Sequence, residues 1–289
     1  MAKSLPGAVF LLAAFACGAA AVAAAEDDTS VPLPETNAFI EEVRQNLRSD
    51  RQLLEQYTFT ETKTEKRMDG KGRVKKVKAE TFEVYPSLEP GRMYRRLVAR
   101  DGVPVSEKDL EAQDRKQEAR AEKAARDTAG QEADRREEER VVDEIRQIYE
   151  VVLVGREKVD GHDTILVNFA PKPGYRAVTK GGKFLQKVEG RAWVDERDRQ
   201  LVRVEVTLLD NLGVGPAGVV RLQKGARSYF HRRKVNDEIW LPAEARFTGA
   251  AKVLLFFGGR VDTLFEYSDY KKFSVSTEPK VGSAEPPPN

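Results

Sequence analysis

The spacing of apolar residues predicts one amphipathic helix near the start of the chain. Between Asn37 and Leu54, apolar side chains recur at intervals of three, four and seven residues, which places them on one side of a helix. Asn37 is suited to cap the first turn, where Glu41 and Glu42 favour the positive end of the helix dipole. We therefore expect residues 37–54 to cover an apolar surface that the rest of the chain provides.

From Tyr57 onward the dominant period becomes two, which indicates β-strands. In the stretch 201–209, Val202, Val204, Val206 and Leu208 fall on one face, while charged and hydroxyl side chains fall on the other. Short turn sequences separate most of the runs, so consecutive strands are expected to pair antiparallel. The expected strands are residues 57–65, 74–85, 93–100, 150–154, 164–169, 190–194, 201–209, 219–231, 239–247, 252–257 and 261–267.

A twisted sheet of about eleven strands tends to curl towards a barrel. We therefore predict a mainly β fold of the α+β class, a curved antiparallel half-barrel with residues 37–54 as an N-terminal lid helix. This domain is expected to cover residues 37–273. Residues 26–36 are expected to be a linker, and residues 274–289, which end in Glu-Pro-Pro-Pro-Asn, a disordered tail.

A charged segment interrupts the β pattern. Residues 106–146 contain fourteen acidic and ten basic residues, with alanines between them, which predicts a solvated helical hairpin or a single helix with a break near residues 128–130. Only its end is expected to dock, through a stripe formed by Val141, Val142, Ile145, Ile148 and Tyr149. We interpret residues 106–149 as an exposed charged helical insertion, and the alternative is an arm that binds a protein partner.

Residues 1–25 have the order of a secretory signal peptide. Lys3 is followed by an uncharged apolar stretch and by small residues up to Ala25. We expect cleavage after Ala25 and export across the inner membrane to the periplasm. The alternatives are a retained membrane anchor and lipid attachment at Cys17, the only cysteine of the chain. Cleavage at Ala25 would leave a protein without thiol or disulfide chemistry.

The charge of the chain argues against a nucleic-acid partner. Lysine and arginine exceed aspartate and glutamate by only two, whereas a dedicated nucleic-acid binder needs a strong basic field. Basic residues do gather in residues 172–191 and again in residues 221–234. We interpret them as outward positions of amphipathic strands and loops, and the alternative is a peripheral contact with anionic lipid headgroups at a membrane surface.

No motif in the sequence indicates catalysis, a cofactor or a metal site. Residues 213–218 match the G-x-G-x-x-G pattern, but a strand rather than a helix is expected to follow, so we interpret them as a hairpin loop. His162 and His231 are far apart and lack ligand spacing. The acidic pairs at 195–196 and 237–238 are interpreted as turn residues. We therefore predict a non-catalytic protein without a cofactor.

One strand is apolar at every position. Residues 253–257 read Val-Leu-Leu-Phe-Phe, so both faces of this strand need cover unless one face binds a ligand. The two interpretations are a buried central strand and one wall of a groove for an apolar ligand, with the N-terminal helix as its lid. The candidate groove residues are Phe39, Val43, Leu47, Val204, Val206, Leu208, Leu254, Phe256 and Phe257.

Several short fragments, in this order, resemble a known superfamily. They are Tyr57-Thr-Phe-Thr-Glu61, Gly190-Arg-Ala-Trp-Val-Asp195, Gln200-Leu-Val-Arg203, Ile239-Trp-Leu-Pro242 and Phe265-Glu-Tyr-Ser-Asp-Tyr270. Together with the leader and the lid helix, they resemble the LolA-like lipoprotein-carrier superfamily over residues 37–273, apart from the charged segment. The resemblance implies an open half-barrel, capped by helices, whose concave apolar face receives acyl chains.

Two functions follow from this resemblance as hypotheses. The first is a periplasmic, non-catalytic carrier or binding protein for a lipid or an acylated lipoprotein, related to outer-membrane lipoprotein sorting. The alternative is an envelope interaction or stress-sensor module that binds a protein partner through the charged helix. The fragments carry no residue role with them, because they are loose patterns.

Overall fold

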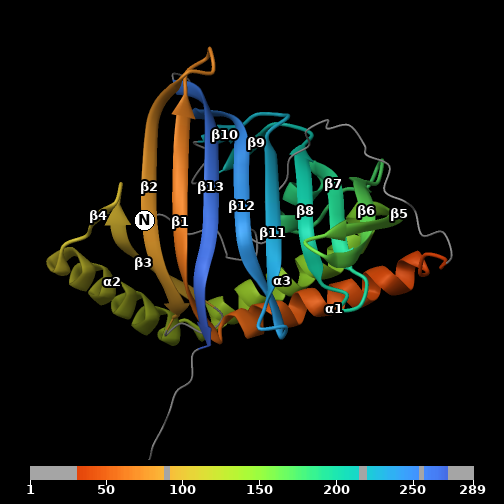
Figure 1. The fold of residues 1–289 in the computed structure, drawn as a ribbon, viewed down its shortest axis with the longest axis horizontal. Coiled ribbons are helices and arrows are strands. Elements are labelled where there is room, and N and C mark those ends of the chain that lie inside the picture. The colour runs from red at the N-terminus through yellow and green to blue at the C-terminus, as the bar shows by residue number, and fades with distance from the viewer. Residues whose placement is uncertain (1–30, 88–91, 215–219, 254–256, 273–289) are drawn as a thin grey trace, which may run out of the picture.

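One curved, antiparallel sheet runs through the protein (Figure 1). The structure is a computed structural model that describes residues 31–87, 92–214, 220–253 and 257–272. In these residues the sheet has 13 strands, in the order β4-β3-β2-β1-β13-β12-β11-β8-β7-β6-β5, with β10 pairing β12 and β9. The strands are β1 (Tyr57–Met68), β2 (Val74–Pro86), β3 (Met93–Arg100), β4 (Val103–Pro104), β5 (Tyr149–Val159), β6 (His162–Pro171), β7 (Val188–Asp195), β8 (Leu201–Leu208), β9 (Leu212–Val214), β10 (Val220–Leu222), β11 (Arg227–Val235), β12 (Ile239–Val253) and β13 (Phe257–Lys272). The predicted open, curved antiparallel sheet is confirmed.

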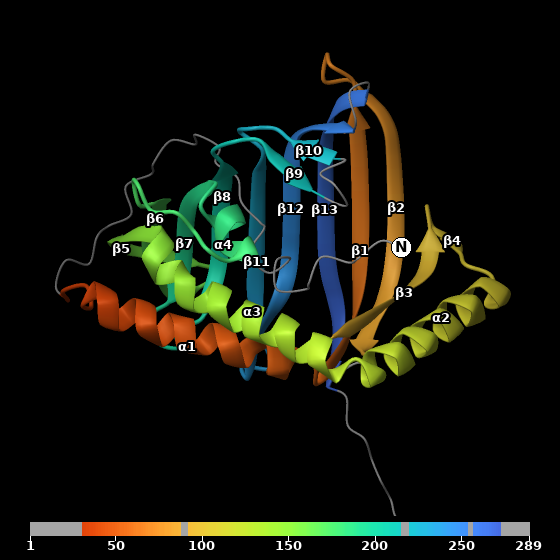
Figure 2. The same ribbon diagram turned by 180° about the vertical axis from the view of Figure 1, so that it is seen from behind.

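Four helices accompany the described part of the sheet. They are α1 (Thr36–Leu54), α2 (Glu107–Arg126), α3 (Thr128–Ile148) and α4 (Lys180–Leu185). Figure 2 shows α1 and α3 crossing the lower ends of the strands on the concave side of the sheet, with α2 at the edge near β3. Arg44 of α1 and Asp143 of α3 form an ion pair at 2.6 Å, so these two helices lie side by side. Within the described residues, no helix combines the length and the apolar character needed to cross a bilayer.

The strand count and several strand boundaries differ from the sequence prediction. The expected strands 239–247 and 252–257 are wrong as separate strands, because β12 runs from Ile239 to Val253 and Val253 pairs with Phe257 of β13. The strands β5 and β13 also extend several residues beyond their expected bounds. The expected strand 219–231 is two strands, β10 and β11, because the chain turns at Gly225 with a positive φ of 79°. The short strands β4 and β9 were missed because two or three residues cannot show a period. Residues 258–259 were expected to be a turn, but both lie within β13 and pair with β12. A Cβ at Gly259 would lie 3.0 Å from the carbonyl oxygen of Met68, so this glycine allows a close approach of strands.

The helix α1 begins as expected but is capped by another residue. The carboxylate of Glu35 accepts hydrogen bonds from the backbone N–H groups of Asn37 and Ala38, at 2.9 and 2.7 Å. The predicted cap, Asn37, is therefore wrong. The helix starts at Thr36, which places Asn37 inside the first turn, where its own N–H needs an acceptor. The hydrogen bonds from these two N–H groups lower the pKa of Glu35.

The charged segment forms two helices that meet at Asp127, as the expected break predicts. Asp127 lies between α2 and α3, and its side chain accepts a hydrogen bond from Gly130 N at 3.0 Å. Val141, Ile145 and Ile148 of α3 pack against an apolar cluster on the sheet, which confirms the docking of this end. The helix α2 also docks, contrary to expectation. Its contacts with β3 are mostly polar, so a hydrophobic pattern could not show them.

A fourth helix replaces an expected turn. Gly181 and Gly182 were expected in a turn between the strands 164–169 and 190–194, but residues 180–185 form α4, which is capped by the hydroxyl of Thr179. A Cβ at Gly181 would lie 2.6 Å from a methyl group of Val141 on α3. These glycines therefore serve the close packing of two helices rather than a turn.

Candidate functional site

A row of apolar side chains crosses the helix-bearing face of the sheet. Residues that lie directly opposite each other in antiparallel strands point to the same face. From β6 to β13 the successive partners are Val167, Ala192, Val204, Phe230, Ala245 and Phe265. We call these six residues the apolar row.

The helices cover only one end of the apolar row. Val167 and Ala192 are buried with Phe39 and Val43 of α1. Ala245 and Phe265, at the other end, are only partly buried. Figure 2 shows the upper parts of β12 and β13 without a helix in front of them. The row therefore begins in a packed core and ends at two side chains that are only partly buried.

The candidate groove residues from the sequence fall into two adjoining clusters. Phe39 and Val43 pack in the cluster under α1, whereas Val206 and Leu208 are buried in a second cluster with Ile148 and Leu185. Val204 packs against both clusters and joins them. Leu254 and Phe256 lie outside the described residues, as do the side chains of Leu47 and Phe257.

The opposite end of the same face is ionic. Lys63 is the β1 partner of Phe265, and its ammonium lies 3.3 Å from Glu80 and 3.6 Å from Glu65. Burial acts to raise the pKa of Glu65, but the hydrogen bond from Arg67 and the neighbouring positive charges hold it below its usual value. The concave face is therefore amphipathic, with apolar side chains from β6 to β13 and ion pairs on β1 and β2.

A buried carboxylate extends this ionic region to β3. Glu61 is only 5% exposed and is paired with Arg95. The Arg95 guanidinium also stacks over the ring of Phe82, at 4.2 Å from its centroid. The sequence missed this site, although Phe59 and Glu61 alternate with threonines in the expected ribbon. The alternation predicts that Phe59 and Glu61 share one face of the strand. It cannot predict that Glu61 pairs with Arg95, which is 34 residues away on another strand.

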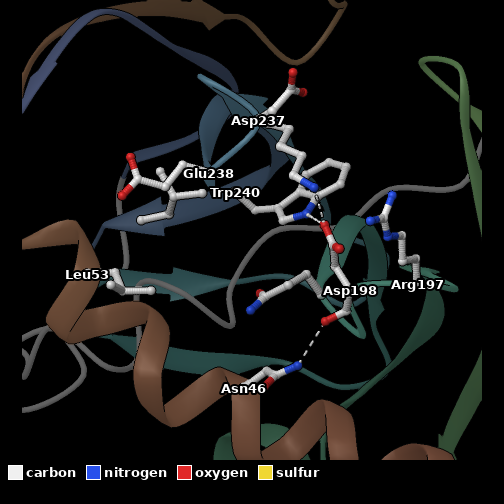
Figure 3. A pocket seen from close by; sticks show the side chains of 10 residues that line it. Asn46, Leu53, Arg197, Asp198, Asp237, Glu238 and Trp240 are labelled. Carbon is white, nitrogen blue, oxygen red and sulfur yellow. Dashed lines mark hydrogen bonds and ion pairs between the residues drawn. The ribbon is translucent and has the colours of Figure 1, made fainter.

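A polar pocket of about 760 Å³ lies where the C-terminal half of α1 faces two turns of the sheet (Figure 3). Its lining comes from α1, from the β7–β8 turn, and from the ends of β11 and β12 with the turn between them. The lining residues are Asn46, Leu53, Arg197, Asp198, Gln200, Lys234, Asp237, Glu238, Ile239 and Trp240. The acidic pair at 237–238 lies in the turn between β11 and β12, as expected.

Asp198 organises this pocket (Figure 3). Its carboxylate lies 2.6 Å from the Lys234 ammonium and accepts a hydrogen bond from the Trp240 indole at 2.9 Å. Burial acts to raise the pKa of Asp198, but these two hydrogen bonds outweigh it and lower the pKa. The Asn46 side-chain amide donates to the carbonyl oxygens of Asp198 and Arg199. Among the described side chains of α1, Asn46 thus makes polar contacts at the pocket, whereas Phe39 and Val43 make apolar ones with the sheet.

The two histidines, distant in the sequence, both lie near the β5–β6 turn. His231 Nε2 lies 2.6 Å from a carboxylate oxygen of Asp160, although the two atoms are not aligned as a hydrogen bond. His162 Nδ1 lies 3.5 Å from the buried carboxylate of Asp195, and its ring packs edge-on against Trp240. In the described residues no group of three metal-ligating side chains could hold an ion. We therefore interpret both histidines as residues that stabilise the β5–β6 turn.

The glycine pattern at residues 213–218 is flanked by paired strands. β9 and β10 pair antiparallel, with Val214 opposite Val220. The segment therefore connects a hairpin, as interpreted from the sequence, and residues 215–219 themselves lie outside the described residues.

Comparison with known proteins finds similar folds only among solved structures. No family model matches the chain. No curated protein matches its sequence either.

A DUF1329 family protein from Desulfovibrio piger is 15% identical, with a TM-score of 0.32, over 83% of this chain and 93% of that protein. The LolA superfamily protein NE2245 from Nitrosomonas europaea is 12% identical, with a TM-score of 0.31, over 84% and 96%. An outer membrane lipoprotein-sorting protein domain from Vibrio parahaemolyticus is 12% identical, with a TM-score of 0.28, over 83% and 95%. The LolA superfamily, which the sequence fragments resemble, is named among these structures, and likenesses of this size assign neither a family nor a role to the chain.

Proposed function

We propose that the protein binds the acyl chain of a lipid or lipoprotein on the open part of its concave face, as a non-catalytic carrier of the periplasm. The observation that carries this proposal is the apolar row, which continues past the helices to Ala245 and Phe265. Burial of apolar surface supplies about 0.8 kcal/mol for each methylene group, so a hydrocarbon chain gains affinity along such a row. The periplasmic location depends on the expected signal peptide at residues 1–25.

The ionic end of the concave face suits the polar part of an amphiphile. Lys63 lies directly beside Phe265 in the register, and Arg95 lies beyond it with a side chain that is 44% exposed. An acyl chain along the apolar row would bring its polar group towards these cations. Such a surface favours an amphiphile over a purely apolar molecule.

The helix α1 regulates access in this proposal. Asn46, in the middle of the helix, donates to backbone carbonyl oxygens at the pocket, and such hydrogen bonds exchange readily with water. Its N-terminal half covers Val167 and Ala192. Movement of α1 away from the sheet would lengthen the open part of the apolar row, and its return would help to release a ligand.

A pair of variants on adjacent residues tests the proposal. Phe265→Glu places a charge in the apolar row, whereas Leu264→Glu places the same charge on the opposite face of the same strand. We expect a fluorescent fatty acid to bind the unmodified protein and the Leu264→Glu variant alike, and to bind Phe265→Glu at least about tenfold more weakly. Equal binding by all three proteins, or no binding by the unmodified protein, would refute the proposal. Thermal unfolding checks that both variants are folded.

A protein partner for the charged helices remains the second candidate, because α2 reaches past the edge of the sheet (Figure 1). Many of the charges, however, already pair within their own helix, as Arg115 does with Glu111 and Arg136 with Glu132. Internal pairing at this spacing is typical of a solvated surface. The acyl-chain proposal is therefore the stronger one.

Substitution of exposed charged residues can distinguish the two proposed functions, whereas deletion of the charged helices cannot. Removal of the segment would also remove Ile148, which is part of the sheet core. Substitution of Arg115, Arg135 and Arg136 by Gln keeps the docked end of α3. A sensor module should lose its partner in pull-downs from envelope extracts, and a carrier should keep its fatty-acid affinity.

A further inference from the structure

The two edges of the sheet, at β3–β4 and at β5, differ in how well they are protected from pairing with another chain. At the β3 edge, the Gln113 side chain of α2 accepts from Leu97 N and donates to Leu97 O, at 3.0 and 3.1 Å. The strand beyond it, β4, has two residues and ends in Pro104. A covering helix, a very short strand and a proline are the features that prevent a sheet edge from pairing with another chain.

The β5 edge lacks these features. β5 is 11 residues long, contains no proline, and pairs only with β6 among the described strands. Val152 and Val154 are 57% and 49% exposed. Alternate backbone N–H and C=O groups of an edge strand face away from the sheet without a strand partner.

Among the described residues, only the second half of this edge has another segment of the chain hydrogen-bonded along it. In the second half, Arg156 donates to the carbonyl oxygens of Val31 and Pro32, so the chain before α1 lies against it. The register shifts between Leu153 and Gly155, which ends the regular part of the strand. The free, regular segment is therefore residues 149–154, a length typical of a strand.

This segment is self-complementary. It reads Tyr-Glu-Val-Val-Leu-Val, with the single charge of Glu150 near one end. In an antiparallel pair of two such segments centred on Val152, that residue faces its own copy, Val151 faces Leu153, and Glu150 faces Val154. No like charges become opposed, and the four exposed valines of the two copies lie together on one side. Val151 and Leu153, on the other side, already pack against the cluster under α1.

We propose that two copies of the chain pair antiparallel through residues 149–154 of β5, about a two-fold axis at Val152. The pairing gives each edge the backbone hydrogen bonds that it lacks and joins the two sheets into one. Because the axis is perpendicular to the sheet, both concave faces open to the same side. This inference is independent of the proposed ligand.

Sedimentation velocity over a range of concentrations tests the pairing. We expect a reversible dimer for the unmodified chain, and a dimer at least about tenfold weaker for Val152→Lys, which opposes two charges at the axis. Val103→Lys is the control, since Val103 is a 67% exposed valine at the other edge, and it should leave the dimer unchanged. A monomer at all concentrations, or a dimer that Val152→Lys does not weaken, would overturn the proposal. The monomeric result would leave this edge to an extended segment of another protein.

Cysteine cross-linking supplies a second readout that does not depend on dimer affinity. In a chain with Cys17→Ala, Val152→Cys places two thiols opposite each other, within disulfide range for a directly opposed pair. We expect mild oxidation to give a covalent dimer of Val152→Cys and none of Val103→Cys. Equal yields from the two positions would contradict the assigned axis.

Discussion

At the scale of single residues, Glu144 shows how one carboxylate attaches α3 to the loop between β6 and α4. It is 4% exposed and accepts hydrogen bonds from the backbone of Val178 and Thr179, from the Thr179 hydroxyl and from the Tyr175 hydroxyl. Burial acts to raise the pKa of Glu144, but these hydrogen bonds outweigh it and lower the pKa. A group whose pKa is lowered by folding stabilises the folded state above its unfolded value and loses this effect as the pH falls.

Replacement of Glu144 by Gln should therefore lower the free energy of unfolding at pH 7 by about 1.5–3 kcal/mol, the range for hydrogen bonds to a charged group. The difference between the two proteins should shrink as the pH falls below about 4.5, the ordinary value for this side chain. Urea unfolding at pH 7 and at pH 3.5 measures both effects. Glu139→Gln, in an exposed pair with Arg135, is the control and should change stability by less than about 1 kcal/mol. An equal loss in both variants would count against the role of Glu144.

Single residues were the least predictable level. Glu144 is one of fourteen acidic residues in its segment, and its burial depends on a loop more than thirty residues away. The same holds for Asp198, which no pattern in the sequence singled out and which lies at the centre of a pocket in the structure. A long-range hydrogen bond leaves no period in the sequence, so a pattern of apolar positions cannot show it.

At the scale of elements, length decided what the sequence could predict. The helix at 37–54 and strands such as β2, β3 and β8 repeat their pattern several times, and the structure has them at nearly the expected bounds, whereas β5, β12 and β13 run well beyond theirs. The helix α4 and the strands β4 and β9 are shorter than two periods, and they are held by contacts with other elements. Glycines misled the prediction twice, at Gly181 and Gly259, because glycine marks close approach as well as turns.

The contact between α3 and α4 gives a test at this scale. Gly181→Ala would place a methyl group 2.6 Å from Val141, so the two helices must separate. In an unhindered helix, alanine is more favourable than glycine by about 0.5–1 kcal/mol. We therefore expect the clash with Val141 to outweigh the better helix propensity of alanine. The free energy of unfolding should fall by about 1–3 kcal/mol. Gly155→Ala, whose methyl group would meet nothing within 4 Å, should cost less, and a stabilised Gly181→Ala protein would refute this packing.

The apolar contact of Phe39 and the hydrogen bonds of Asn46, both on α1, give a second test at this scale. Phe39 is 1% exposed in an apolar cluster, and Phe39→Ala should cost about 3–5 kcal/mol in unfolding free energy. Asn46→Ala removes two hydrogen bonds at the edge of the pocket and should cost about 1 kcal/mol. Hydrogen exchange should quicken along the second half of α1 in Asn46→Ala only. Uniform exchange along α1 in this variant would mean that the helix moves as a rigid unit.

At the scale of the whole molecule, the order of the strands creates the amphipathic concave face. The sequence placed Val202, Val204, Val206 and Leu208 on one face, and the structure places the last three in adjoining clusters with Phe39 and Val43. The prediction is wrong for Val202, which packs with Trp193 and Trp240 instead, because the register of β7 and β8 shifts beside it. It missed Phe230, Ala245 and Phe265, because β8 pairs with β11 and not with the next strand along the chain. Strand order in a sheet depends on long-range pairing, so the continuation of the row could not be predicted from neighbouring residues.

The shape beneath α1 also refines the expected groove. Apolar side chains fill the space under the first half of the helix, and the pocket under the second half is polar. An acyl chain is therefore proposed to lie on the open strands beside the helix, with Phe265 near the centre of its contact. In this proposal the ligand contacts the face of β13 that carries Phe265 and not the face that carries Leu264.

Native mass spectrometry of the full chain purified from cell envelopes tests acyl-chain binding most directly. We expect the unmodified protein and Leu264→Glu to carry an added mass that matches a lipid recovered in a solvent extract, and Phe265→Glu to lack it. Bare protein in all three samples, or the same lipid on Phe265→Glu, would contradict a ligand site on the apolar row.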